Sequence, residues 1–464
     1  MSRKLFFPFD DDSNELVNRY ENFLKGKESG YFDVEEIENI VEFYLQNGQT
    51  KDCSTVLELG LKLHPNNNAL YIKRAKLYLA IGDYLRALRI LENIADTGDY
   101  DVLLLKIETL DRLERVSEAK ALSDKTIADE QNALDDICLD IAYIFLAQNE
   151  FDIALKYLEI GEQANPQNVD LLFELAFTYE QSNAIEKAIS VYNRMIDINP
   201  YSAEAWFNLG QIYYKSEDYN NSLEAYEFVL TIEPTDTLSW LQKGHIHFQL
   251  NEYQQAIDAY EEYKKLTGNT WQIFLFIAEC YENLEKYNEA ILNYQSSLLE
   301  KSDNFEAFTG IALCLLEQEL FAKSIEYLEY ALKLNPDSSE ALVYLAEALV
   351  GIGSLNEALQ NYLKANVFNP DQPEILMSIA NLYMDRGEFE NAIEYYNNAI
   401  KLQPTQPYAN LFISVAYFKM KNIKQSAVFY HKANPFESDE VRDFFLELCP
   451  ETDEPPHLNK KKKI

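Results

Sequence analysis

Histidine and cysteine are the side chains of this chain best suited to hold a metal ion or act as nucleophiles. His245 and His247 are the closest histidine pair in the sequence. Residues two apart on a helix point about 200° apart, so this pair cannot hold one ion from one helical face. The cysteines are odd in number, far apart and form no CxxC motif, which favours reduced thiols over a disulfide framework or a zinc site. They are Cys53, Cys138, Cys280, Cys314 and Cys449.

Carboxylates are the other abundant reactive groups, and they set the charge of the chain. There are 77 Asp and Glu residues against 40 Lys and Arg residues, a net charge of −37. Carboxylate pairs arise by chance at this density, so they do not indicate glycosidase or metal chemistry. The sequence has no P-loop, no HExxH, no dinucleotide-binding glycine motif and no EF-hand loop. We therefore expect no catalytic residue, no cofactor and no metal.

The same charge bears on partners and location. A net charge of −37 disfavours binding to the phosphates of nucleic acids and to anionic membrane surfaces. No stretch approaches the ~20 apolar residues of a membrane span, and the apolar run near Met1 is too short for the core of a signal peptide. Together with reduced thiols, these features predict a cytoplasmic protein that does not insert into a membrane.

The elements that would position any site follow a period of 34 residues. Turn-prone Gly268 and Ser302 fall on two beats of this period that lack proline. A fixed period of this length is typical of a solenoid, in which each unit buries its apolar face against its neighbours. The prolines that mark the other beats are Pro166, Pro200, Pro234, Pro336, Pro370 and Pro404.

Each unit has two apolar stripes at helical spacing, separated by a polar break. In the unit that begins at Ala203, the first stripe ends before Ser216 and the second ends before Pro234. Gly or Asn follows the first stripe in many units, and these residues tolerate the left-handed conformation that closes a helix; they are Gly48, Gly82, Asn149, Asn183, Asn251, Gly353 and Gly387. The stripes of the clearest unit are Trp206, Leu209, Gly210 and Tyr213, then Tyr219, Ser222, Tyr226 and Val229.

This order of residues resembles the tetratricopeptide repeat (TPR), in multi-repeat cytosolic scaffolds of the bacterial type. The resemblance implies an all-α fold, an α-solenoid of about twelve helix-turn-helix repeats that forms a right-handed superhelix. In the third unit, Glu108 and Lys120 occupy the two places where other units have small residues. The units begin near residues 34, 68, 101, 135, 169, 203, 237, 271, 305, 339, 373 and 407.

The ends of the chain differ from the repeats. We expect an N-terminal segment with a capping helix over 1–33, the TPR superhelix over 34–435, a C-terminal capping helix over 436–449, and a disordered tail over 450–464 that carries Lys460 to Lys463. End helices are needed because a terminal repeat otherwise exposes its core face. The repeats take up nearly all residues and leave no room for a catalytic domain.

In the family that the chain resembles, first helices line a concave groove that receives a peptide. We therefore expect a non-catalytic interaction scaffold or adaptor, whose groove binds a protein or peptide with Lys or Arg and apolar anchors. A regulatory subunit of an enzyme complex and a structural unit that self-assembles through its terminal helices stay open as alternatives, as does the oligomeric state. The expected groove residues are Phe173, Phe177, Glu180, Phe207, Gln211, Tyr214, Leu241, His245, Phe248, Leu275, Glu279 and Glu282.

Overall fold

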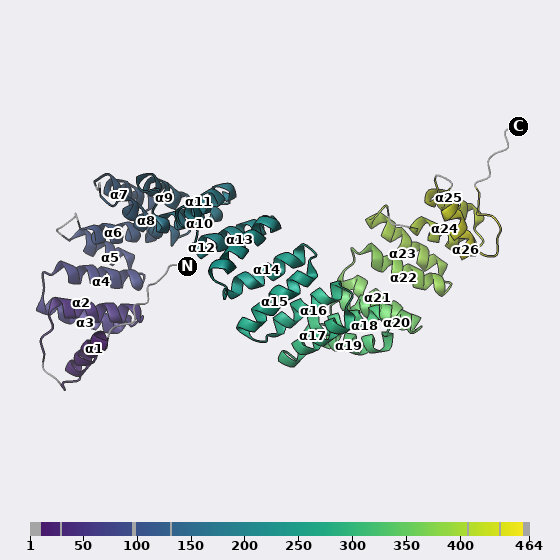
Figure 1. Cartoon of the computed structure of the whole chain (residues 1–464), viewed down its shortest axis with the longest axis horizontal. Coiled ribbons are helices and arrows are strands. Elements are labelled where there is room, and N and C mark those ends of the chain that lie inside the picture. The colour runs from purple at the N-terminus through teal and green to yellow at the C-terminus, as the bar shows by residue number, and fades with distance from the viewer. Residues whose placement is uncertain are drawn as a thin grey trace. The chain divides into compact units, whose positions relative to one another are not determined.

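The computed structural model describes residues 11–27, 30–94, 99–129, 132–405, 408–435 and 438–457, with side chains from residue 15 on. These residues form 26 α-helices and no strand, so the predicted all-α repeat solenoid is confirmed. Twelve antiparallel helix pairs follow one another between two single end helices (Figure 1). The chain divides into two compact units, Met1–Ile232 and Glu233–Ile464.

Unit 1 contains an end helix and six helix pairs, in which each first helix packs against its own second helix and most first helices also pack against the next one (Figure 1). The end helix is α1 (Asp11–Leu24). The pairs are α2 (Val34–Gln46) with α3 (Thr50–Leu63), α4 (Asn68–Ala80) with α5 (Tyr84–Glu92), α6 (Tyr100–Arg112) with α7 (Val116–Asp129), α8 (Leu134–Leu146) with α9 (Phe151–Ala164), α10 (Val169–Gln181) with α11 (Ile185–Ile198), and α12 (Ala203–Lys215) with α13 (Tyr219–Ile232).

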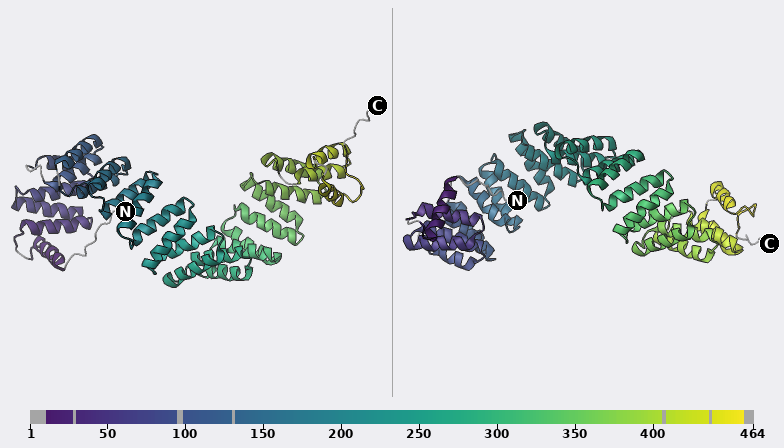
Figure 2. Two further views of the ribbon diagram at one scale, coloured as in Figure 1. Left: turned by 45° about the horizontal axis from the view of Figure 1, so that its top comes forward. Right: turned by 90° about the horizontal axis from the view of Figure 1, so that it is seen from below.

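Unit 2 contains the other six pairs and a second end helix, and Figure 2 shows the pairs from two further directions. The pairs are α14 (Thr237–Gln249) with α15 (Tyr253–Thr267), α16 (Trp271–Asn283) with α17 (Tyr287–Glu300), α18 (Phe305–Glu317) with α19 (Phe321–Leu334), α20 (Ser339–Gly351) with α21 (Leu355–Phe368), α22 (Pro373–Asp385) with α23 (Phe389–Leu402), and α24 (Ala409–Lys419) with α25 (Ile423–Ala433). The end helix is α26 (Asp439–Leu448).

Local sequence signals set the limits of these helices. Most first helices begin after a residue whose side-chain oxygen accepts a hydrogen bond from the backbone amide three residues on, such as Asp33, Asn168 and Ser338. Each of the seven Gly and Asn residues expected in the left-handed conformation has a φ between 58° and 81°. In other pairs a residue such as Glu217 or Lys421 occupies that place. The turn geometry therefore belongs to the repeat and does not require glycine.

Inside a pair, the small residue of the first helix leaves room for a ring from the second helix. A Cβ atom added to Gly244 would lie 2.3 Å from Cε1 of Tyr260, and one added to Gly210 would lie 3.0 Å from Cε2 of Tyr226. Both tyrosine rings are buried. The close approach of the two backbones therefore depends on the missing side chain.

The third pair corrects one expectation from the sequence. The first helix α6 begins at Tyr100, 32 residues after α4 begins at Asn68, so the pair lies one residue earlier than its predicted start. Ala119 is fully buried in the small-residue place of α7, while Lys120 is partly exposed. Ile107, not Glu108, is buried in α6. Assigning Glu108 and Lys120 to small core positions was therefore wrong.

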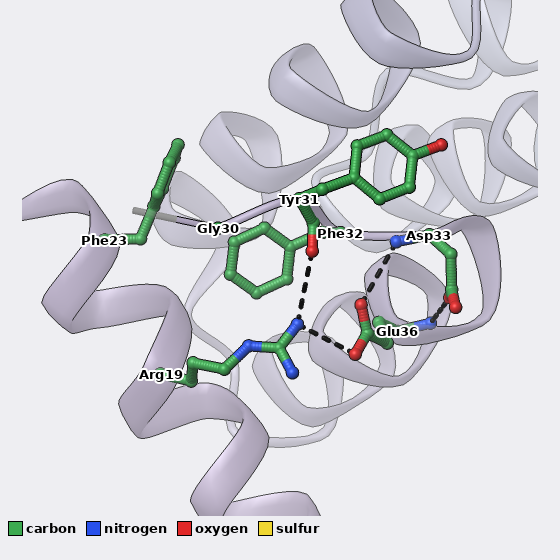
Figure 3. A pocket seen from close by; sticks show the side chains of 7 residues that line it. All are labelled: Arg19, Phe23, Gly30, Tyr31, Phe32, Asp33 and Glu36. Atoms are coloured by element: carbon green, nitrogen blue, oxygen red, sulfur yellow. Dashed lines mark hydrogen bonds and ion pairs between the residues drawn. The ribbon is translucent and has the colours of Figure 1, made fainter. Parts of the chain in front are cut away.

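An aromatic and ionic contact joins α1 to the first pair (Figure 3). The guanidinium group of Arg19 lies 4.6 Å from the centre of the Phe32 ring and donates a 2.8 Å hydrogen bond to Oε1 of Glu36. Tyr20 is buried with edge-on contacts to Phe32 and Tyr44. The end helix thus covers the open face of the first repeat.

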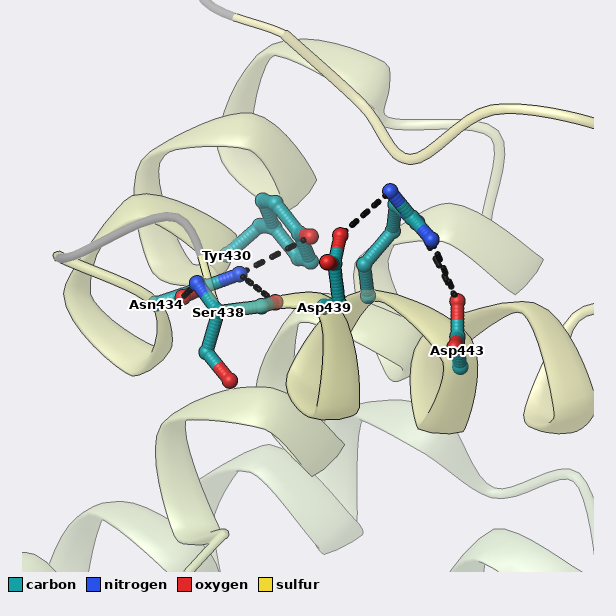
Figure 4. A network of polar contacts seen from close by, with 6 residues as sticks. Tyr430, Asn434, Ser438, Asp439 and Asp443 are labelled. Atoms are coloured by element: carbon teal, nitrogen blue, oxygen red, sulfur yellow. Dashed lines mark hydrogen bonds and ion pairs between the residues drawn. The ribbon is translucent and has the colours of Figure 1, made fainter.

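The other end helix, α26, covers the last pair. Phe445 is fully buried against the rings of Phe418 and Tyr430. Asn434 accepts a 2.6 Å hydrogen bond from the amide of Ser438 and donates to the Ser438 carbonyl, which joins the end of α25 to the start of α26 (Figure 4). Residues 458–464, with the predicted tail lysines Lys460 to Lys463, lie outside the described residues. The domain limits at 33, 435 and 449 stay a prediction.

The contact between Gly244 and Tyr260 gives a graded test of the packing. Gly244→Ala should lower the melting temperature, because the added methyl group overlaps the Tyr260 ring and such overpacking costs ~1–3 kcal/mol. Gly210→Ala gains the same helix propensity, roughly 0.5–1 kcal/mol, with a milder overlap, and should cost less. Thermal unfolding followed by circular dichroism measures both. Equal melting temperatures for the two variants would contradict the role of this close approach.

Candidate functional site

The predicted groove residues of unit 1 come from two neighbouring pairs. The first helix α10 carries Phe173, Phe177 and Glu180, and α12 carries Phe207, Gln211 and Tyr214. All six are partly exposed, which leaves part of each side chain open to a partner.

The aromatic members of this set also pack against the core. Phe207 meets the buried Tyr226 ring edge-on at 5.5 Å, and Phe173 meets Tyr192 at 6.5 Å. The ring of Tyr214 lies 5.7 Å from that of Tyr219, and burial raises the pKa of Tyr214. One side of each ring therefore packs against another aromatic ring, and the remaining part of the side chain is exposed to solvent.

An ion pair joins the two helices of this surface. Lys215 of α12 donates a 2.5 Å hydrogen bond to Oε1 of Glu180 on α10. The carboxylate of Glu180 is thus neutralised within unit 1. The chemistry of this surface is aromatic and amide-like, with little net charge.

In unit 2 the predicted residues lie on α14 and α16. Nδ1 of His245 lies 2.8 Å from the Tyr260 hydroxyl, and its ring contacts Phe276 edge-on at 4.9 Å. Burial lowers the pKa of His245, which favours a neutral imidazole. Leu241 and Phe248 are partly buried beside it. Leu275 is 6% exposed and belongs to the hydrophobic core, so it offers little surface for contact.

Glu279 and Glu282 are the carboxylates of this set in unit 2. Burial, followed by the charges of Glu282 and Glu306, raises the pKa of Glu279 to about 7. Burial also raises the pKa of Glu282, although a 2.8 Å hydrogen bond from the Tyr294 hydroxyl opposes the shift. Two half-buried carboxylates thus lie close enough to repel each other.

Four further carboxylates extend this cluster along the first helices α18 and α20. The charge of Glu306 acts on Glu279, and the charges of Glu317 and Glu340 act on Glu282. Partial burial and the charge of Glu317 raise the pKa of Glu347. The helices α16, α18 and α20 lie side by side in unit 2. We call this set the acidic cluster: Glu279, Glu282, Glu306, Glu317, Glu340 and Glu347.

The acidic cluster is not neutralised within the described part of the chain. None of its six carboxylates forms an ion pair with a described Lys or Arg side chain, whereas Glu180 in unit 1 does. Glu340 accepts a 3.1 Å hydrogen bond from Tyr344, which is a neutral donor. The acidic cluster therefore concentrates negative charge on one surface, where Glu279 and Glu282 are partly shielded from water.

The sequence reasoning missed four of these residues, although a signal was present. Glu306 and Glu340 follow the first residue of α18 and α20, and Glu347 occupies the place in α20 that Glu279 has in α16. Extending the register of the predicted groove residues over α18 and α20 would have found Glu347 alone, because Glu306, Glu317 and Glu340 occupy other places in their helices. What the register does not reveal is the partial burial that makes the carboxylates repel.

A pocket at the end of unit 2 is more apolar. It has a volume of about 560 Å³ and lies between α22, α24 and the end helix α26. The residues that line it include the apolar Met384, Phe412, Val415, Phe444 and Leu448 and the charged Lys419 and Asp385. This pocket offers a second place where an apolar side chain could bind.

The groups first considered for chemistry are mostly buried. His247 is buried, with Nδ1 2.7 Å from a carboxylate oxygen of Glu252. All five cysteines are buried and unpaired, and burial raises the pKa of the Cys53 and Cys280 thiols to about 12. Thiols with a raised pKa are poor nucleophiles near neutral pH.

The described residues contain neither a cluster of metal-binding side chains nor a helix suited to cross a membrane. No three His, Cys, Asp or Glu side chains in the described ranges are grouped as a metal site requires. Within those ranges, no helix combines the length and apolarity needed to cross a bilayer.

Comparisons with solved structures show likeness at low identity. A TPR protein described as having an unusual peptide-binding site, YrrB, is 21% identical, with 43% of this chain and 99% of that chain covered and a TM-score of 0.35. The Cut9–Hcn1 hetero-tetramer of APC/C is 15% identical over 87% of this chain and 96% of that one, with a TM-score of 0.39. A C-terminal part of a TPR protein from Cytophaga hutchinsonii is 14% identical over 52% and 98%, with a TM-score of 0.45. These likenesses carry no information on a partner.

Family models match the repeats directly. Three models described as tetratricopeptide repeat match the chain. The first matches residues 139–203 and 277–337, the second matches 315–382, and the third matches 373–406. A model described as anaphase-promoting complex, cyclosome, subunit 3 matches residues 181–263. None of the curated proteins compared matches the chain significantly. The matched segments coincide with the repeated helix pairs, in which small residues of the first helix contact buried tyrosines of the second. The chain belongs to the tetratricopeptide repeat family.

Proposed function

We propose that this protein is a non-catalytic cytoplasmic scaffold whose first-helix surface in unit 2 binds a protein segment with Lys or Arg beside apolar side chains. Tetratricopeptide repeats generally serve protein–protein interaction, which supports the scaffold role. The observation that carries the proposal is the acidic cluster, with six carboxylates and no described basic partner.

The chemistry of the cluster selects the partner. A half-buried carboxylate gains more from a cation than an exposed one does, because little water screens the pair. Glu279 and Glu282 would bind an ammonium or guanidinium group, and the exposed carboxylates of α18 and α20 would attract the rest of a basic segment. Partly buried apolar residues beside them, such as Leu241 and Phe248, would contact its apolar side chains.

The aromatic surface of α10 and α12 supports a second contact area within unit 1. Phe207 and Tyr214 are held by Tyr226 and Tyr219, so little side-chain entropy would be lost when a partner covers them. Large rigid rings of this kind dominate many interfaces. A regulatory subunit of an enzyme complex would use the same surfaces, and self-assembly would instead use the end helices α1 and α26.

The first binding prediction concerns the charge of the cluster. In the double variant Glu279→Gln and Glu282→Gln, a fluorescent peptide of alternating Lys and Leu should associate more slowly and with a weaker dependence on salt, because charge steers the encounter. Stopped-flow fluorescence at several salt concentrations measures this. The control is Glu289→Gln with Glu300→Gln, two exposed carboxylates on the second helix α17. Equal effects of the two double variants would argue against a specific site.

The second binding prediction concerns pH. With a pKa of about 7, Glu279 is largely protonated at about pH 6 and ionised at about pH 8, while peptide lysines stay charged at both. Affinity for the Lys–Leu peptide should therefore rise with pH, by up to about tenfold over this range. Glu279→Gln should remove most of that rise. Equilibrium titrations of the wild type and of Glu279→Gln with the peptide measure the affinity at both pH values. Weaker binding by the wild type at the higher pH would refute the role of Glu279.

The third binding prediction separates the aromatic surface from the core. Phe207→Ala with Tyr214→Ala should speed dissociation of a bound partner about thirtyfold if each ring contributes ~1 kcal/mol or more. The exposed Tyr201→Ala serves as the control. Dissociation kinetics and thermal unfolding should be measured together. If the double variant melts far below the wild type, these rings belong to the core and the contact area in unit 1 has no aromatic floor.

A further inference from the structure

Two acidic side chains meet in the interior of unit 1. Asp111 of α6 is 5% exposed, and neither of its carboxyl oxygens accepts a hydrogen bond from an amide or hydroxyl group of the described residues. Oε2 of Glu150 and Nε2 of Gln148, both in the turn between α8 and α9, are also buried without such a partner. Buried polar atoms normally have partners, so this group needs an explanation.

The two carboxyl groups can satisfy each other through one proton. Burial, the charge of Glu150 and a hydrogen bond to Glu150 raise the pKa of Asp111 to about 7. Two carboxylates that share a buried site cannot both ionise without strong repulsion. A protonated Asp111 that donates its hydrogen to Glu150 resolves both the repulsion and the missing hydrogen bond.

Neighbouring charges do not replace this proton. Arg112 lowers the pKa of Asp111, but it follows Asp111 on the same helix and lies 3.9 Å from Glu108, whose charge raises the pKa of Asp111. Lys76 of α4 acts on Glu108. Among the described groups that act most strongly on Asp111, none comes from α5, α7 or the body of α8.

The position of the pair gives the proton a structural role. Helix α6 packs against α8, and the turn that carries Glu150 is itself well held. The amide of Glu150 donates a 3.0 Å hydrogen bond to the Phe145 carbonyl, and its own carbonyl accepts one from Ala154. Repulsion between the two carboxylates would therefore act on the contact between α6 and the turn, and not within the turn.

We propose that Asp111 and Glu150 form a proton-dependent contact between the third and fourth helix pairs, which holds while they share a proton and loosens when it is lost. The contact is independent of the binding surfaces proposed above. It would make the first repeats of unit 1 more mobile at alkaline than at mildly acidic pH.

The direction follows from proton linkage. The pKa of Asp111 in the folded chain, about 7, lies above the ~3.9 of an unfolded Asp. The folded state thus binds the proton more tightly than the unfolded state does. The stability of this contact therefore falls as the pH rises from the unfolded pKa of ~3.9 to the folded pKa of about 7. Between about pH 6 and pH 8, the equilibrium constant for local opening should rise about tenfold.

Hydrogen exchange measured by mass spectrometry on the full chain tests the proposal. After correction for intrinsic exchange rates, wild-type amides of α6 and of the α8–α9 turn should open about tenfold more at about pH 8 than at about pH 6. Asp111→Asn keeps a donor for Glu150 without a titrating proton, so both segments should stay protected at both pH values. The exposed Asp101→Asn, on the same helix, should keep the wild-type pH dependence.

Glu150→Gln is the second variant and should weaken the pH dependence, because it removes the charge of Glu150 while burial still raises the pKa of Asp111. It carries the test if Asp111→Asn fails to fold by circular dichroism. Equal wild-type protection at both pH values would overturn the proposal. It would also be overturned if a folded variant of Asp111 or Glu150 kept the wild-type response.

Discussion

The close approach of the two helices in each pair is the contact on which the rest of this structure depends. Where Gly244 lacks a side chain, the ring of Tyr260 lies against the backbone of the first helix. Gly210 and Tyr226 repeat the arrangement in unit 1. A larger residue would push the helices apart, and because each pair packs on the next, the error would pass to its neighbours. The small residue thus fixes the distance between the two helices of a pair.

The same tyrosines connect the core to the surface where a partner would bind. Their rings are buried, but their hydroxyl groups reach polar residues of the first helices: Tyr260 meets His245, Tyr294 donates to Glu282, and Tyr396 donates to Asn381. A hydrogen bond from a neutral donor helps Glu282 to remain ionised although it is half-buried. One tyrosine, Tyr294, thus contributes both to the packing of the core and to the charge state of Glu282.

The sequence predicted the fold well because the period is a local property repeated many times, so errors in one unit do not shift the others. It failed in the third pair, where a shorter spacing moved the register and put Ala119 in the place given to Lys120. Of the acidic cluster it predicted Glu279 and Glu282 but not their neighbours on α18 and α20. It could not reveal the meeting of Asp111 with Glu150, because burial and contacts between repeats decide it.

The acidic cluster and the Asp111–Glu150 pair show two ways of keeping carboxylates in a partly desolvated place. In unit 1 the two acids are buried together, and one shared proton removes the repulsion without any other molecule. In unit 2 the carboxylates line an open surface, where both protons and outside cations can reach Glu279 and Glu282. A cation bound there would relieve the mutual repulsion as well as form new contacts. Because it would bind the folded unit and not the unfolded chain, it would also stabilise the repeats beneath it. The mutual repulsion of these carboxylates is therefore a reason to expect a basic partner.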